Sequence, residues 1–176
     1  TSDLVKRVAR REPLQGRVFS AHEEAVVGAS IPLGIGDSFA ASHGDGYSLW
    51  RLGMAYVEGT VRPKDSAKAV KYFQQSADVG SPNGTASLAV MYVTGDGVKL
   101  DYSKAMSLYE RSAELGNAHA YREMAVMYMQ GEGVDIDLSR AYSLYTKAIE
   151  AGDPEDPDLK RVLLDRMKAE GLLKAQ

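Results

Sequence analysis

The sequence contains no cysteine, which excludes disulfide bonds, thiolate nucleophiles and zinc sites built on cysteine. It also lacks long hydrophobic runs. The longest, residues 88–93 and 124–129, have six residues each, far fewer than the roughly 20 that a membrane-spanning helix needs. Neither sign of charge is in large excess, because the 176 residues carry a formal net charge of only −3. We therefore expect neither nucleic-acid binding nor membrane insertion by this segment.

What the sequence does contain is an internal repeat of 36 residues. Similar residues recur at this spacing in nine columns, without an insertion. The columns are Leu52/Leu88/Met124, Gly53/Ala89/Ala125, Tyr56/Tyr92/Tyr128, Gly59/Gly95/Gly131, Asp65/Asp101/Asp137, Lys68/Lys104/Arg140, Ala69/Ala105/Ala141, Phe73/Tyr109/Tyr145 and Gly80/Gly116/Gly152.

Each repeat predicts two helices. The first helices cover about residues 47–58, 84–94 and 119–130, where apolar and small residues recur every four positions and a glycine follows. The second helices begin at Asp65, Asp101 and Asp137, whose side chains can cap the first turn, and each ends at a glycine. Because one hairpin cannot bury its own apolar faces, we expect the three to stack on a continuous core.

The second repeat shows the pattern most fully, as Leu88-Ala89-x-x-Tyr92-x-x-Gly95-x-Gly97-Val98-x-x-Asp101-x-x-Lys104-Ala105. This string resembles the signature of Sel-like repeats, which are relatives of the tetratricopeptide repeats. The resemblance implies an all-α fold, a right-handed α–α superhelical solenoid of three helix pairs over residues 46–81, 82–117 and 118–153. The first repeat departs from the pattern at Val61 and Arg62-Pro63, so we expect a differently shaped loop there.

The two ends lie outside the repeat. Residues 154–176 predict a capping helix with Asp156 as N-cap and Pro157 in its first turn. We expect the apolar face of this helix to pack on the last repeat and to contain Leu159, Val162, Leu163 and Met167. The opposite face, which points away from the repeats, contains Arg161, Asp165 and Lys168. Residues 1–45 predict an irregular arm or linker because Pro32 and several glycines interrupt them. The apolar residues of this arm suggest that it lies extended against the solenoid.

Motifs for catalysis or metal binding are incomplete throughout. The Gly-Asp-Ser-Phe block at residues 36–39 resembles that of an esterase family but lacks the later Asp-x-x-His. The His-Glu-Glu at 22–24 lacks a second histidine four positions on, and the glycine loops at 95–97 and 131–133 lack the end of a phosphate-binding loop. The acidic residues of 153–158 lack calcium-ligand spacing. We expect no catalytic, cofactor or metal site, and no enzyme.

A second face of the first helices remains once the core columns are subtracted. In tetratricopeptide-like solenoids, which the chain resembles, first helices line the concave side that usually takes partners. The candidate partner-binding residues are Trp50, Met54, Val57, Val90, Val93, Arg122, Val126 and Met129, and Ala86 shares their spacing. Two interpretations stay open: contact with a partner, or packing, either as core or as a bed for residues 18–45.

The resemblance implies a non-enzymatic protein–protein interaction scaffold, since Sel-like repeat proteins act as adaptors and regulators. The alternative is an extracytoplasmic sensor or regulatory module of a bacterial membrane or cell-envelope protein that binds a glycan or peptidoglycan fragment. The resemblance favours a periplasmic or other extracytoplasmic location over a cytoplasmic one. Exposed aromatic and amide side chains on the binding face would favour the glycan, and a bare apolar face would favour a protein.

Overall fold

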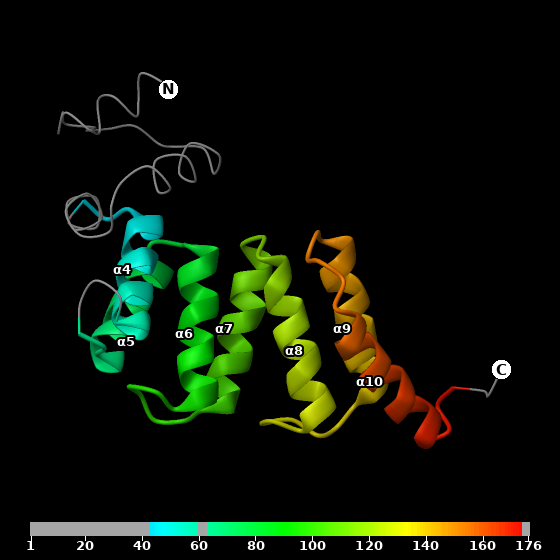
Figure 1. The fold of residues 1–176 in the computed structure, drawn as a ribbon. Coiled ribbons are helices and arrows are strands. Elements are labelled where there is room, and N and C mark those ends of the chain that lie inside the picture. The colour runs from blue at the N-terminus through cyan, green and yellow to red at the C-terminus, as the bar shows by residue number, and fades with distance from the viewer. Residues whose placement is uncertain (1–42, 60–62, 174–176) are drawn as a thin grey trace. The chain divides into compact units, whose positions relative to one another are not determined.

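The computed structural model describes residues 43–59 and 63–173, and these residues form helices and loops without a strand. Figure 1 shows the helices in chain order. They are α4 (Gly46–Glu58), α5 (Ser66–Asp78), α6 (Pro82–Thr94), α7 (Tyr102–Glu114), α8 (Ala118–Gln130), α9 (Leu138–Glu150) and α10 (Pro157–Ala169). Two predicted helices fall in each repeat and one follows the repeats, so the all-α prediction is confirmed. The hypothesis that the arm lies against the solenoid and the predicted shape of the first loop concern residues outside these ranges.

The chain forms two compact units, residues 1–84 and 85–176, and the boundary falls inside α6. In the first unit, α4 and α5 pack closely through small residues. A Cβ at Gly53 would lie only 2.4 Å from Cε1 of the buried Phe73 ring, which explains why glycine occupies this column here. The Ser76 hydroxyl of α5 donates a 2.6 Å hydrogen bond to the Gly46 carbonyl at the start of α4.

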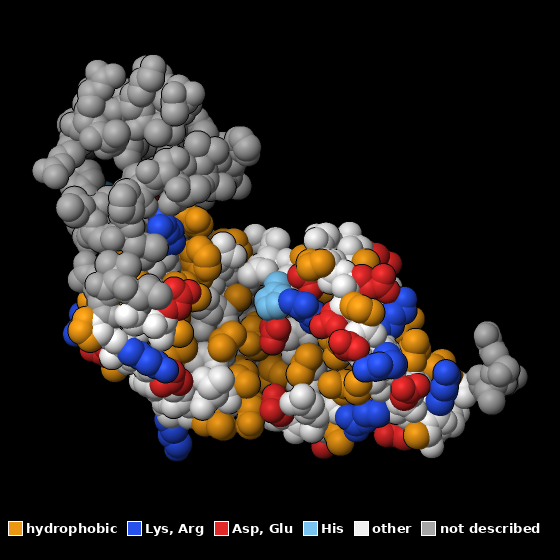
Figure 2. All heavy atoms as spheres, in the orientation of Figure 1, with side chains coloured by type: hydrophobic (Ala, Val, Ile, Leu, Met, Phe, Trp, Pro, Cys, Tyr) orange, Lys and Arg blue, Asp and Glu red, His pale blue; other side chains and the backbone are white. Residues whose placement is uncertain are grey.

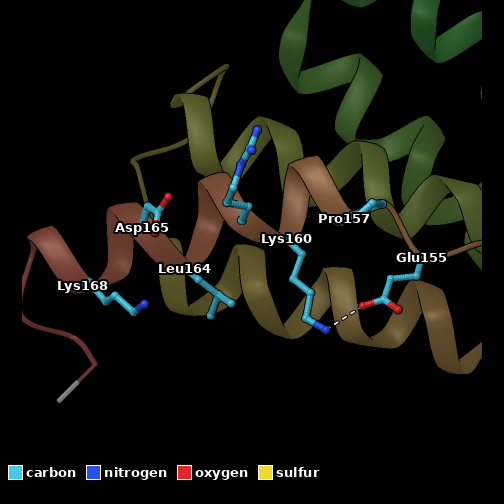
Figure 3. Close-up of a pocket in the computed structure, with 7 residues that line it drawn as sticks. Glu155, Pro157, Lys160, Leu164, Asp165 and Lys168 are labelled. Carbon is cyan, nitrogen blue, oxygen red and sulfur yellow. Dashed lines mark hydrogen bonds and ion pairs between the residues drawn. The ribbon is translucent and has the colours of Figure 1, made fainter. Parts of the chain in front are cut away.

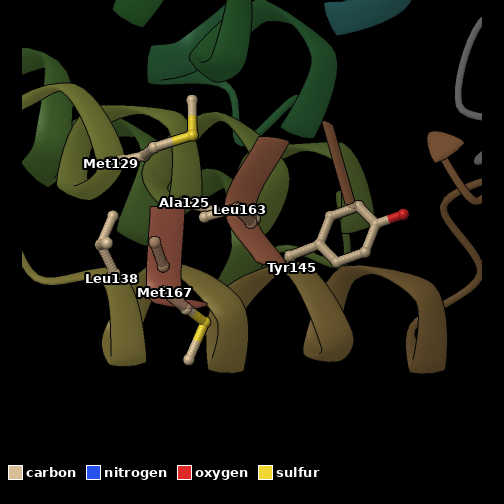
Figure 4. Close-up of a cluster of buried hydrophobic side chains, with 7 residues drawn as sticks. Ala125, Met129, Leu138, Tyr145, Leu163 and Met167 are labelled. Carbon is tan, nitrogen blue, oxygen red and sulfur yellow. The ribbon is translucent and has the colours of Figure 1, made fainter. Parts of the chain in front are cut away.

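In the second unit, α8, α9 and α10 share one hydrophobic cluster. Figure 4 shows side chains from all three helices pointing toward one another. The cluster contains Ala125, Met129, Leu138, Ala141, Tyr145, Leu163 and Met167. Ala125, Ala141 and Leu163 are fully buried, so the capping helix belongs to the core of this unit.

The start of each second helix is built in the same way in all three repeats. The side chains of Asp65, Asp101 and Asp137 accept hydrogen bonds of 3.0, 2.9 and 2.8 Å from the backbone N–H three residues on. The backbone N–H of each aspartate donates a 3.0 Å bond to the carbonyl of the tyrosine nine residues before it. A basic side chain lies over each of these tyrosine rings, with Lys68 over Tyr56, Lys104 over Tyr92 and Arg140 over Tyr128. Each hairpin therefore carries its own hydrogen-bonded start signal.

The capping helix begins as predicted, but its buried face is narrower than expected. The Asp156 side chain accepts hydrogen bonds from the backbone N–H groups of Asp158 and Leu159. Leu163 and Met167 are buried and Leu159 is half-buried. Val162 is 41% exposed, so its assignment to the apolar face was wrong. Neighbouring residues on a helix point about 100° apart, and only the Leu163 side of the stripe reaches the core.

Candidate functional site

In the first unit, the predicted partner-binding residues lie on α4. Trp50, Met54 and Val57 are all half-buried. The ring of Trp50 packs at a tilt against the ring of Tyr47, with 5.4 Å between centroids. The three residues therefore keep part of their surface accessible.

In the second unit, α6 and α8 present aliphatic side chains at equivalent positions of successive repeats. Val90 is 42% exposed, and its counterpart Val126 and its neighbour Val93 are half-buried. Ala86 is buried. Figure 2 shows hydrophobic side chains gathered over α6 and α8 on the face toward the viewer. We call Val90, Val93 and Val126 the valine face.

The other two predicted partner-binding residues of this unit, Met129 and Arg122, make contacts within the fold. Met129 is only 7% exposed and belongs to the cluster beneath α10. Arg122 Nε lies 3.1 Å from Oδ2 of Asp153, and its Nη1 lies 4.0 Å from Oδ2 of Asp156. Arg122 thus ties α8 to the segment that leads into α10 through these ion pairs.

His119 and Glu123 complete this charged cluster on the first turn and a half of α8. His119 Nε2 lies 3.0 Å from Glu123 Oε1, and Nδ1 contacts the Arg122 guanidinium and lies 3.6 Å from Asp153 Oδ1. The hydrogen bond to Glu123 raises the pKa of His119, while partial burial and the Arg122 charge oppose the rise. No sequence motif predicts this cluster, and the available signal was the acidic run at 153–158, which supplies Asp153 and Asp156.

Two carboxylates flank the buried Tyr109 of α7. Burial raises the pKa of the Tyr109 hydroxyl, and the negative charges of Glu123 and Glu132 raise it further. Glu123 stands near the middle of α8, and Glu132 follows the end of this helix. Both side chains are half-buried.

A shallow depression on α10 offers no evident chemistry. Figure 3 shows its lining, with Lys160, Leu164, Asp165 and Lys168 along the helix. Lys160 Nζ is held 2.6 Å from Glu155 Oε1. Within residues 43–59 and 63–173, no group of three histidine or acidic side chains is arranged to hold a metal ion. No helix in these ranges has the length and apolar character to cross a bilayer.

Comparison with solved structures gives close matches to repeat proteins. A Sel1 repeat protein from Oxalobacter formigenes superposes with a TM-score of 0.67 at 30% sequence identity, over 77% of this chain and 54% of that one. A protective antigen of uropathogenic Escherichia coli strains, which displays an SLR fold, superposes with a TM-score of 0.67 at 27% identity, over 85% of this chain and 33% of that one. The chain thus spans about half the length of the first protein and a third of the second.

A search of the curated proteins finds no significant match. The family model for the Sel1 repeat matches residues 46–81, 83–117 and 118–153. Together with the structural matches, these repeats make the fold an all-α repeat solenoid. The chain belongs to the Sel1 repeat family.

Proposed function

We propose that the chain is a non-catalytic scaffold or adaptor and that the valine face of its second unit contacts a protein or peptide partner. Sel1 repeats generally mediate protein–protein interactions. The observation that carries the proposal is that Val90 and Val126 occupy the same register position in successive repeats, Val90 exposed and Val126 half-buried. A partner that covers both gains the free energy of burying their remaining apolar surface, on the order of 1 kcal/mol for each side chain.

The chemistry of this face favours a protein partner over a glycan. Glycan binding calls for exposed aromatic or amide side chains, but the valine face is aliphatic. The nearby tyrosines Tyr92 and Tyr128 are covered by Lys104 and Arg140, which lie over their rings at 4.4 and 4.7 Å. The alternative of an extracytoplasmic sensor that binds a glycan remains a prediction of the sequence, and the Tyr47–Trp50 pair of α4 is an aromatic surface that suits it.

The test compares partner capture by three matched forms of the intact chain. Val90→Ser with Val126→Ser removes the aliphatic side chains with little change in helix propensity. Leu115→Ser is the control, because Leu115 is similarly exposed, at 40%, but lies at the end of α7. Purified chain is used to capture proteins from an extract of the source cells, and circular dichroism checks that each variant is folded.

A protein that binds the unmodified chain and the control but is lost with the double serine variant supports the proposal. Retention of every bound protein by the double serine variant contradicts it. A separate Trp50→Ala, Met54→Ala variant applies the same comparison to α4, where these two side chains are half-buried.

A further inference from the structure

We propose that the segment bound on the valine face is cationic, with an aliphatic side chain next to lysine or arginine. This inference rests on the proposed function, because it names the chemistry of the partner at the same surface. It is carried by two glutamates near Val126, Glu123 and Glu132, with which no described lysine or arginine pairs, while the neighbouring Arg122 is paired with Asp153.

Glu123 lies on the same side of α8 as Val126, three residues away, which brings the two side chains together on the helix surface. Glu132 follows the end of this helix, and its backbone N–H donates a 3.0 Å hydrogen bond to the carbonyl of Met127, the residue after Val126. The negative charges of both glutamates also raise the pKa of the Tyr109 hydroxyl. Asp96 occupies the register of Glu132 in the preceding repeat. Figure 2 shows acidic side chains beside the hydrophobic area over α8.

The basic groups near these carboxylates are engaged elsewhere. Arg122 is paired with Asp153 at 3.1 Å, and Arg166 of α10 donates a 2.5 Å hydrogen bond to the Met129 carbonyl. His119 Nε2 lies 3.0 Å from Glu123 Oε1 and offsets part of that carboxylate's charge when the imidazole is protonated, whereas Glu132 has no such partner among the ion pairs of the described residues. Among the residues that the structure describes, no lysine or arginine forms an ion pair with Glu123 or Glu132.

The surroundings of the carboxylates make this charge effective. Glu123 and Glu132 are half-buried, so solvent screens them less than it screens fully exposed groups. A lysine or arginine that arrives beside them replaces lost water contacts with charge-assisted hydrogen bonds. An acidic or neutral apolar segment would cover the same valines but would bring no counter-charge to Glu132, which costs free energy.

The inference is tested with a phage-displayed library of random peptides selected on the immobilised, intact chain. The binding of the selected peptides is then measured by fluorescence anisotropy at neutral pH. The Glu123→Gln, Glu132→Gln variant removes the proposed partners of the cation. The Glu114→Gln, Glu150→Gln variant is the matched control, because it changes the net charge equally at exposed positions of α7 and α9.

We expect selected peptides to be enriched in lysine and arginine beside aliphatic residues. Their affinity should fall roughly two- to fivefold for each glutamate replaced, and it should fall further as salt is added. The control should bind as the unmodified chain does. Selected peptides without such enrichment, or equal affinity for both glutamine variants, would overturn the inference.

Val90→Ser with Val126→Ser separates the two proposals. If this variant loses about tenfold in affinity while the glutamine variant loses none, the valine face binds peptides but its partner is not selected by charge. If neither variant loses affinity, or no peptide is selected, the proposed function fails with the inference. Sedimentation of the unmodified chain tests a further outcome, which is self-association. If the chain associates with itself and the double serine variant does not, the valine face binds a second copy of the chain, and the inference of a cationic partner is overturned.

Discussion

At the scale of single residues, Tyr145 shows how one hydroxyl joins two elements. The side chain is 2% exposed, and its hydroxyl donates a 2.8 Å hydrogen bond to the Asp156 carbonyl and accepts a 3.0 Å bond from the Asp156 N–H. The same register position holds Phe73 in the first repeat, which has no hydroxyl. The hydroxyl therefore serves the segment that enters α10.

Tyr145→Phe is expected to lower the free energy of unfolding by about 1–2 kcal/mol, because both backbone groups of Asp156 lose their partner. Urea denaturation followed by circular dichroism measures the change. Tyr142→Phe is the control, since the Tyr142 hydroxyl makes no hydrogen bond within the described part of the chain. Equal stability of the two variants would show that the Tyr145 hydroxyl contributes nothing to the fold.

His119 gives a prediction about pH. Its pKa is raised chiefly by the hydrogen bond to Glu123, so the folded protein holds the imidazole proton more tightly than the unfolded chain does. The resulting contribution to stability is fully present below the unfolded pKa of about 6.5. It is lost as the pH rises through the higher folded value.

An NMR titration of the His119 ring should give a pKa above about 6.5 in the unmodified chain. Glu123→Gln should lower this pKa, because it removes the carboxylate that favours the charged imidazole. The other charged groups around the ring, Arg122 and Asp153, stay in place in this variant. An unchanged pKa would show that the contact with Glu123 is not the cause.

At the scale of helices, the three aspartate caps can be compared directly. Asp137→Ala removes the acceptor for the Arg140 N–H at 2.8 Å and should cost about 1 kcal/mol of stability. Asp137→Asn should cost much less, because an amide oxygen can accept the same bond. Thermal unfolding of the two variants decides: an equal loss would mean that the charge, and not the hydrogen bond, stabilises α9.

The packing of α10 gives a second helix-scale prediction. Leu163 is fully buried beside Ala125 and Tyr145, so Leu163→Ala should cost about 2–5 kcal/mol through lost burial and the cavity that remains. Its neighbour Val162 is 41% exposed, and Val162→Ala should change stability by less than about 0.5 kcal/mol. Similar losses in urea denaturation would show that α10 is not seated on α8 and α9 as described.

At the scale of the whole molecule, the 36-residue period was sufficient to predict the helices of the three repeats, α4 to α9. It works because every repeat uses local signals: an aspartate begins each second helix, and Gly59 and Gly131 end first helices in the left-handed conformation at φ of 70° and 78°. These signals act within one hairpin, so one sequence contains all the information needed to find them. The predicted fold follows from them without any knowledge of long-range contacts.

The candidate site was harder to predict because its decisive contacts join distant residues. Arg122 meets Asp153 across 31 positions, and no spacing rule connects them. Met129 occupies the register position of Val93, but it is buried in the cluster that includes Leu163 and Met167 of α10. That contact was not predictable from the repeat, because α10 does not follow the 36-residue register. Val90 is exposed and Val126 is half-buried, and their contact with a partner stays a prediction.

Each hairpin contains its own aspartate cap and its own loop, closed by the hydrogen bond from the aspartate N–H to the tyrosine carbonyl. This has a consequence for how the number of repeats can change. A duplicated or deleted block of 36 residues brings or removes a complete set of these signals. Recombination in whole blocks thus leaves every remaining helix with intact ends, whereas a cut inside a block leaves one helix without its first-turn acceptor. A gain or loss of whole blocks therefore leaves the helix-start signals of every remaining repeat in place.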